Sequence, residues 1–284
     1  MTDHEGFDPS FDDTQWTDGW LHVPIAQPPP GVHPSGYRVE RRALHEVEVF
    51  DRPYRLAAPL DCRFLFDPGG RLWMSDTPQE RMMMYNNGQR SRGSVLVGGL
   101  GLGLYPQYAV AGGAARFTVI ERSSVVRDIV EPTLSVALGV PLEVRLGDVG
   151  AYLSGPVAAH YDTIFLDTWE SLDAVHLPEV NRLRDLALRH LAPDGRVLLW
   201  GYGWMLRLFE EACRQLLAVA PARRGAWLEG QAGASLPAVA LLGPVVEHFR
   251  GRVVAGRDVA EALAWCRRYV VGLDFVGELV RFSS

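Results

Sequence analysis

The clearest pattern of hydrophobic and polar positions lies in residues 94–121. Apolar residues fill 95–97 and 117–120, and between them a glycine-rich turn leads into a short apolar helix over 104–111. Short apolar runs on either side of a helix are typical of buried parallel strands joined by a crossover. This stretch predicts a strand–turn–helix–strand unit that opens an α/β domain.

The same alternation continues towards the C-terminus. Strands that alternate with helices imply a parallel sheet with helices on both faces, and ligands of such sheets bind at the carboxyl ends of the strands. The pattern predicts helices at 123–138, 179–191, 204–219 and 258–269 (N-cap Asp258), and strands at 142–146, 161–166, 196–200, 239–242 and 275–282.

Before residue 76 the pattern changes to short β-rich pieces. The segments CRFLFD and RLWMS flank Asp67-Pro68-Gly69-Gly70, which predicts a hairpin. A helix is expected from 76 to about 85, because an acidic residue and a proline open it. We therefore expect a small antiparallel β unit with its linking helix over 37–90 and a nucleoside-binding catalytic domain over 91–284.

Residues 1–36 are rich in acidic residues and contain three consecutive prolines, which is typical of a poorly ordered tail. Trp16 and Trp20 are unusual for such a tail. They favour the alternative that the segment docks on the rest of the protein.

Composition narrows the class of protein further. The 284 residues carry a formal net charge of −6 without a basic tract, so we expect no binding to nucleic acid or to anionic membranes. The first residues are polar and no apolar run is long enough to cross a bilayer, which predicts a cytoplasmic protein. Cys62, Cys213 and Cys266 lie far apart and are expected to be buried free thiols, and the histidines show no metal-ligand spacing.

The spacing of the glycines helps to identify the ligand. Gly99, Gly101 and Gly103 form G-x-G-x-G, whereas a dinucleotide-binding fingerprint begun at Gly99 would require glycine at Leu104. Glu121 ends the next strand, where a carboxylate can accept both hydroxyls of a ribose. The pattern predicts a nucleoside site, and the alternative is a structural turn that binds nothing.

Two further acids follow strands of the predicted sheet. Asp148 follows Gly147 and is expected to accept the adenine amino group, or else to serve as a turn residue. Asp167 follows the fourth strand and is placed to act as a general base or to bind a cationic group, with a helix cap as the alternative.

Aromatic residues also gather at these strand ends. Trp169, Tyr202 and Trp204 are candidates to line the pocket of an aromatic or cationic acceptor. Tyr202 and Trp204 flank Gly203 in what is expected to be a loop. Trp200 lies inside a strand pattern, so core packing is at least as good an explanation for it.

Together these motifs resemble the class I S-adenosylmethionine-dependent methyltransferases, and within them the spermidine synthase-like branch. The resemblance covers roughly residues 70–217. GGLGLG matches the glycine motif, Glu121 the ribose-binding acid and Gly147-Asp148 the pair that meets adenine, while YDTIFLDTWE matches the fourth-strand motif. The resemblance implies a Rossmann-like, doubly wound, mostly parallel sheet of about seven strands, the last one antiparallel, preceded by a small antiparallel β unit.

The resemblance also implies roles for single residues. Asp167 matches the acid that deprotonates the attacking amine in polyamine synthases. Glu170 matches the second acid of that motif, with a solvated surface carboxylate as the alternative. Gln79-Glu80 resembles the Q-E pair of the helix that contacts the donor nucleoside. The sequence departs from the branch at Gly101, where those synthases have an aspartate, and at Pro78, where they have a tyrosine.

The function predicted is S-adenosylmethionine-dependent methyl transfer to a small-molecule acceptor, with S-adenosyl-L-methionine or a decarboxylated derivative as donor. A sulfonium carbon is electrophilic without a metal, so the protein has only to align donor and acceptor and remove a proton. The alternatives are aminopropyl or aminocarboxypropyl transfer and a catalytically inactive nucleoside-binding protein. An NAD-dependent oxidoreductase is disfavoured by Leu104. The branch often dimerises, so a homodimer is possible.

Overall fold

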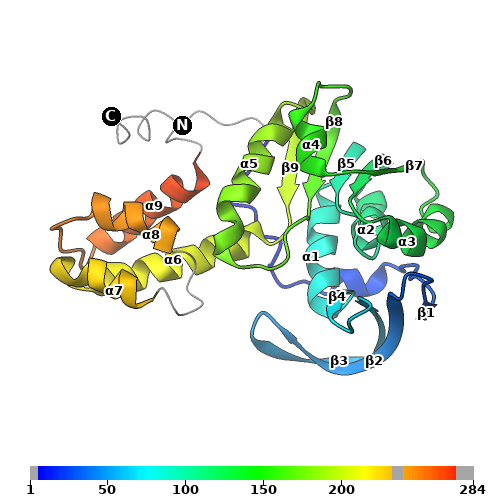
Figure 1. Ribbon diagram of the computed structural model, residues 1–284, viewed down its shortest axis with the longest axis horizontal. Coiled ribbons are helices and arrows are strands. Elements are labelled where there is room, and N and C mark those ends of the chain that lie inside the picture. Colours follow the sequence, from blue (N-terminus) through cyan, green and yellow to red (C-terminus); the bar gives the residue numbers. More distant parts are fainter. Residues whose placement is uncertain (1–5, 232–238, 273–284) are drawn as a thin grey trace.

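A parallel sheet of five strands forms the centre of the molecule in the computed structural model, which describes residues 6–231 and 239–272 (Figure 1). Its strand order is β7-β6-β5-β8-β9, so the chain winds outwards in both directions from β5. All carboxyl ends therefore meet at one edge. The strands are β5 (Gly93–Gly98), β6 (Ala114–Glu121), β7 (Leu142–Leu146), β8 (Tyr161–Leu166) and β9 (Leu191–Leu199).

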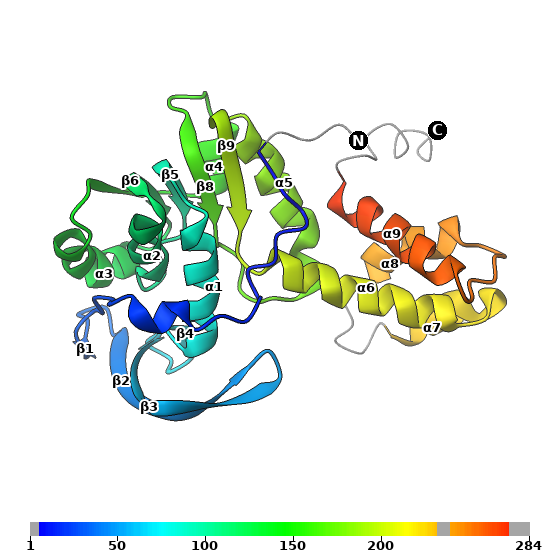
Figure 2. The ribbon, with the colours of Figure 1, turned by 180° about the vertical axis from the view of Figure 1, so that it is seen from behind.

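Helices cover both faces of this sheet, as the alternating pattern predicts. In Figure 1, α4 and α5 lie in front of the sheet, whereas Figure 2 shows α1 and α2 on the opposite face. The Rossmann-like fold class is thus confirmed. The helices are α1 (Pro78–Gln89), α2 (Leu104–Gly112), α3 (Ser124–Ala137), α4 (Val149–Ser154) and α5 (Leu177–Leu188), with a short 3₁₀ helix, η2 (Ala174–His176), before α5.

A separate antiparallel sheet precedes the domain, as expected, but its strands are longer than the predicted pieces. Several pieces merge into two long strands, and residues 56–59, including Pro59, bulge out of the ladder between Arg55 and Leu60. The hairpin predicted at Asp67-Pro68-Gly69-Gly70 is confirmed. The strands are β1 (Gly31–Val32), β2 (Arg38–Val49), β3 (Arg52–Phe66) and β4 (Leu72–Ser75).

Helices α6 to α9 extend from one side of the sheet domain and pack on one another (Figure 1). Two of them confirm the predicted helices 204–219 and 258–269. No helix within 6–231 and 239–272 combines the length and apolar character needed to span a membrane. These elements are α6 (Tyr202–Ala218), the 3₁₀ helix η3 (Pro221–Arg223), α7 (Arg224–Gly230), α8 (Val239–His248) and α9 (Asp258–Val271).

Three predictions in this region need correction. The strand expected at 239–242 is the first turn of α8, because a run of four apolar residues does not distinguish a buried strand from a helix. Arg257 rather than Asp258 is the N-cap of α9. The sheet in the described ranges has five strands, all parallel, instead of about seven; the strand expected at 275–282 lies outside those ranges.

The N-terminal segment, defined here as residues 6–30, is docked on the protein. Phe7 bridges to Val197 of β9, and Trp20 is buried in a short 3₁₀ helix, η1 (Gly19–His22). Trp16 packs edge-on against Tyr54 but remains half exposed. Of the two alternatives for this segment, docking therefore holds from residue 6 onwards.

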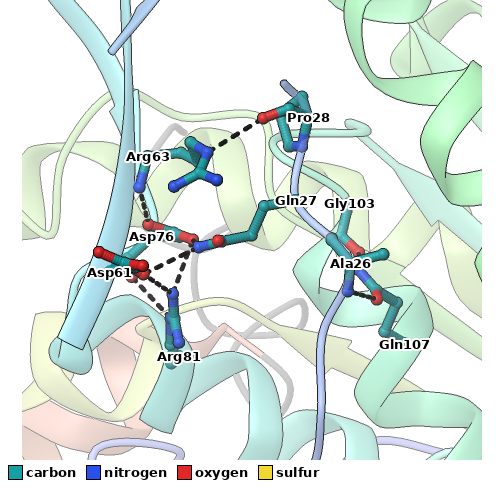
Figure 3. A network of polar contacts seen from close by, with 9 residues as sticks. All are labelled: Ala26, Gln27, Pro28, Asp61, Arg63, Asp76, Arg81, Gly103 and Gln107. Atoms are coloured by element: carbon teal, nitrogen blue, oxygen red, sulfur yellow. Dashed lines mark hydrogen bonds and ion pairs between the residues drawn. The ribbon is translucent and has the colours of Figure 1, made fainter. Parts of the chain in front are cut away.

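Figure 3 shows how the end of this segment is held. Gln107 of α2 accepts a hydrogen bond from the Ala26 N–H at 2.6 Å and donates to the Ala26 carbonyl at 3.0 Å. Gln27 donates to the Asp61 carbonyl at 3.0 Å and to the carboxylate of Asp76, which forms a buried ion pair with Arg81. The segment is thus tied to both the β unit and the helix that follows the glycine turn.

Candidate functional site

The glycine-rich turn connects β5 to α2 at the carboxyl edge of the parallel sheet. Gly99, Gly101 and Gly103 have φ angles of +92°, +55° and +75°, in the left-handed region that favours glycine. A Cβ on Gly99 would overlap the backbone carbonyl of Asp167, whereas one on Gly101 would meet open space. The sequence prediction of a turn is confirmed, and the turn lies directly against the end of β8.

Glu121 lies at the end of β6 beside this turn. Its Oε2 accepts a hydrogen bond from the Leu100 N–H, and its Oε1 accepts one from the Ser123 N–H, both at 2.7 Å. The carboxylate is therefore fixed in position, and each oxygen keeps a second lone pair for a ligand hydroxyl. The Gly147 N–H donates to the Glu121 carbonyl at 2.9 Å, which joins the end of β7 to the same edge.

Asp148 is exposed and forms the N-cap of α4. Its Oδ1 accepts a hydrogen bond from the Ala151 N–H at 2.7 Å. This hydrogen bond is the one expected of a turn or cap residue, the alternative role for Asp148. The second carboxylate oxygen remains available to a ligand. Its role towards adenine stays a prediction.

Asp167 follows β8, and its N–H donates to the Gly98 carbonyl at 2.9 Å. Burial raises the pKa of its carboxyl group to about 7, and the nearby charges of Asp13 and Glu121 act in the same direction. Asp167 therefore holds a proton at higher pH than an ordinary aspartate does, which suits a group that exchanges protons.

Two more carboxyl groups lie close to Asp167. Burial raises the pKa of Glu80, in the first turn of α1, to about 8, with further contributions from the charges of Asp167 and Asp13. Burial also raises the pKa of Asp13 to about 7, although hydrogen bonds from Gly201 and Asn87 oppose the shift. Asp13, Glu80 and Asp167 are called the acid cluster below.

The sequence did not reveal Asp13 as a member of the site. It is one of several acids in a segment that reads as a tail, and only the nearby Trp16 and Trp20 indicate that the segment docks. Glu80 belongs to the Gln79-Glu80 pair that the resemblance marks as a donor contact, and the folded α1 brings it close to Asp167.

Two indole rings adjoin the acid cluster. Trp169 and Trp200 are each about nine-tenths buried, with ring centroids 6.4 Å apart. The Trp169 indole N–H has no hydrogen-bond partner in the described part of the chain. The Trp200 indole faces the Glu80 carboxyl group and holds its pKa below the value that burial alone would give. Trp169 lies beside Trp200, and its role in an acceptor pocket stays a prediction.

Other predicted site residues lie apart from the acid cluster. The Glu170 side chain is 80% exposed, and its carboxylate is 3.6 Å from Arg71 in a surface ion pair. Gln79 uses its Oε1 to accept a hydrogen bond from the Phe50 N–H at 3.0 Å, at the tip of the β2–β3 hairpin. The roles predicted for Glu170 and Gln79 stay predictions.

Tyr202 and Trp204 lie in the first turn of α6, not in a loop as predicted. Gly201, with a φ of +65°, is the N-cap and lets the helix begin at once. The Tyr202 ring is buried, and its hydroxyl donates to Asn181 Oδ1 at 2.7 Å. Trp204 packs on Phe50 at a centroid distance of 4.8 Å.

The carboxyl edge therefore joins three features: a glycine turn, a fixed carboxylate at Glu121 and a group of acids with raised pKa values beside an indole. The turn and Glu121 suit a nucleoside, and the acid cluster suits proton exchange or a cation. Within 6–231 and 239–272, no group of histidine, cysteine or acidic side chains is arranged to hold a metal ion.

Comparison with known proteins finds similar folds only. The sequence matches neither a protein-family model nor a curated relative. An S-adenosylmethionine-dependent methyltransferase from Clostridium acetobutylicum is 12% identical over 38% of this chain and 42% of its own, with a TM-score of 0.30. Precorrin 8w decarboxylase from Methanobacterium thermoautotrophicum is 20% identical over 38% of this chain and 54% of its own (TM-score 0.30). The N-methyltransferase NodS from Bradyrhizobium japonicum is 16% identical over 45% of this chain and 76% of its own (TM-score 0.34).

Proposed function

We propose that the protein binds S-adenosyl-L-methionine and transfers its methyl group to a small-molecule acceptor. The observation that carries the proposal is the contact between Gly99 and Asp167, beside the fixed carboxylate of Glu121. A nucleoside whose ribose is held by Glu121 would place its sulfur substituents towards the end of β8. That is where the acid cluster lies.

The reaction needs little covalent help from the protein. The acceptor nitrogen or oxygen attacks the methyl carbon, the carbon–sulfur bond breaks, and S-adenosylhomocysteine leaves with the bonding electrons. Asp167 takes the proton that the acceptor loses. A carboxylate whose pKa lies near 7 is better suited to that step than one near its ordinary value.

We further propose that the protein belongs to the spermidine synthase-like branch. The antiparallel sheet before the nucleoside domain and the position of Asp167 support it. Transfer of an aminopropyl group from a decarboxylated donor is the second candidate function. The exposure of Glu170, the second acid of the branch motif, favours methyl transfer over that alternative.

Product analysis with a donor labelled in the methyl group tests the proposal. Purified protein is incubated with the labelled donor and pools of amines, phenols and carboxylic acids, and the products are separated. We expect label in an acceptor together with S-adenosylhomocysteine. Transfer from a donor labelled only in its aminopropyl chain would contradict methyl transfer.

Binding measurements provide the control for this experiment. Calorimetry compares S-adenosylhomocysteine with NAD on the same preparation. Binding of S-adenosylhomocysteine alone supports the proposal, whereas preferential binding of NAD would support the oxidoreductase that Leu104 disfavours. Binding of the nucleoside without turnover of any acceptor would favour a catalytically inactive nucleoside-binding protein.

A further inference from the structure

The N-terminal segment reaches the candidate site through one buried side chain, Asp13. Its Oδ2 accepts hydrogen bonds from the Gly201 N–H and from Asn87 Nδ2, both at 2.8 Å. Gly201 lies two residues beyond the end of β9, and Asp167 directly follows β8. The Trp200 N–H donates to the Leu166 carbonyl at 3.0 Å, so these two strand ends are held side by side. Asp13 therefore lies at the same sheet edge as Asp167.

The second oxygen of Asp13 is left without a partner. Asp13 is 1% exposed, and its Oδ1 accepts no hydrogen bond within the described ranges. Buried polar atoms of this kind destabilise a protein unless a proton or a ligand satisfies them. One such atom, Asp13 Oδ1, therefore belongs to the acid cluster.

We propose that Asp13 is a positioning residue of the active site, supplied by the N-terminal segment, and that its charge sets the proton occupancy of Asp167 and Glu80. This inference rests on the proposed function. Asp13 itself touches neither donor nor acceptor in this account. It acts through the two other acids.

Electrostatics gives the direction of the effect. The Asp13 charge raises the pKa of Asp167 and of Glu80, after the larger effect of burial. Two further negative groups act on these acids, Asp12 on Asp13 and Glu121 on Asp167, while Asp12 itself pairs with the positive Arg207. A positive charge that arrives beside the cluster lowers all three pKa values and releases protons.

The methyl donor and its product differ in the charge on sulfur. S-adenosylmethionine carries a sulfonium charge, whereas the sulfur of S-adenosylhomocysteine is neutral. We expect the wild-type protein at pH 7 to release more protons when it binds the former. An Asp13→Asn variant lacks one titrating group, and its two remaining acids have lower pKa values. We therefore expect the excess release, defined as the protons released with S-adenosylmethionine minus those released with S-adenosylhomocysteine, to fall by about half or more.

Calorimetry in two buffers of different ionisation enthalpy measures these protons directly. The matched control is Asp8→Asn, which removes the same charge from the same segment. The Asp8 side chain is 47% exposed and pairs with Arg90 at 3.4 Å, away from the acid cluster. We expect this control to release as many protons as the wild type.

The Asp13→Asn variant should remain docked, because the amide oxygen of the new side chain can still accept from Gly201 and Asn87. Unchanged resistance to proteolysis checks this. A Glu80→Gln variant tests the same coupling from α1 and should also reduce the excess release. Equal release by the wild type and by both variants would overturn the inference while leaving nucleoside binding, and hence the proposed function, intact. Failure of the wild type to bind either nucleoside would overturn both.

Discussion

Gly99 and Asp167 are in contact where β5 and β8 end. The backbones are so close that a Cβ on Gly99 would overlap the Asp167 carbonyl oxygen. The Asp167 N–H donates to the carbonyl of Gly98, the preceding residue, at 2.9 Å. Because Gly99 has no side chain, the turn that is expected to hold the donor can lie against the end of β8, where the candidate base Asp167 stands.

A Gly99→Ala variant should lose both stability and nucleoside binding. The alanine would be strained at a φ of +92° by roughly 1–3 kcal/mol, and its methyl group would push the turn away from β8. Urea denaturation and calorimetry with S-adenosylhomocysteine measure the two effects, and we expect affinity to fall by about tenfold or more.

Gly225→Ala is the matched control for that variant. Gly225 lies in α7, and a Cβ there would meet nothing within 4 Å. We expect a slightly stabilised protein, by up to about 1 kcal/mol, with unchanged affinity. Equal behaviour of the two variants would contradict a special role for Gly99.

Replacing Glu121 by glutamine should weaken nucleoside binding. Both carboxylate oxygens accept backbone N–H groups at 2.7 Å, and a glutamine amide would turn its NH₂ towards one of these donors. The unsatisfied donor costs about 1–3 kcal/mol of stability, and the ribose loses an acceptor. Glu143→Gln on β7, where the exposed carboxylate pairs with Arg145, is the control. Retained affinity in Glu121→Gln would refute the ribose contact.

Asp167→Asn separates binding from catalysis. If Asp167 removes the acceptor proton, turnover should fall by roughly 10²- to 10⁴-fold, while affinity for S-adenosylhomocysteine should change little. Single-turnover kinetics with labelled donor measure the first quantity and calorimetry the second. Unchanged turnover would show that Asp167 is not the base.

Glu170→Gln tests the second acid that the sequence predicts. Because its side chain is 80% exposed and belongs to a surface ion pair, we expect a loss of turnover below about tenfold. A loss of turnover as large as that of Asp167→Asn would instead indicate that Glu170 takes part in catalysis. It would also favour the aminopropyl alternative.

The raised pKa of Asp13 predicts the pH dependence of stability. An unfolded aspartate titrates near pH ~3.9, whereas Asp13 in the folded protein has a pKa of about 7. Between these values the folded state binds more protons, so its free energy of unfolding decreases as the pH rises through 7. From about pH 5.5 to about pH 8, the wild type should lose about 2 kcal/mol more than Asp13→Asn. Urea denaturation at both pH values measures this loss, and parallel losses would contradict the prediction.

The sequence predicted the β5–α2–β6 unit well because its signals are local. Glycines at 99, 101 and 103 require positive φ angles that few other residues adopt, and the flanking apolar runs are short and largely buried. Glu121 and Asp167 followed from the same reasoning, since a residue that ends a parallel strand must lie at the carboxyl edge.

Other features depend on contacts that no local pattern contains. Asp13 meets Gly201 across 188 residues, so its burial depends on where the N-terminal segment docks. The apolar run at 239–242 fits a strand and a helix equally well, and its neighbours decide the outcome. Tyr202 appeared to lie in a loop because Gly201 and Gly203 flank it, yet Gly201 is the N-cap that starts α6.

A structure of the protein with bound S-adenosylhomocysteine is the most direct test of the account. We expect the nucleoside over residues 99–103, the ribose hydroxyls on the Glu121 carboxylate and the sulfur facing Asp167. A nucleoside bound elsewhere, or a sulfur that faces away from the acid cluster, would contradict it.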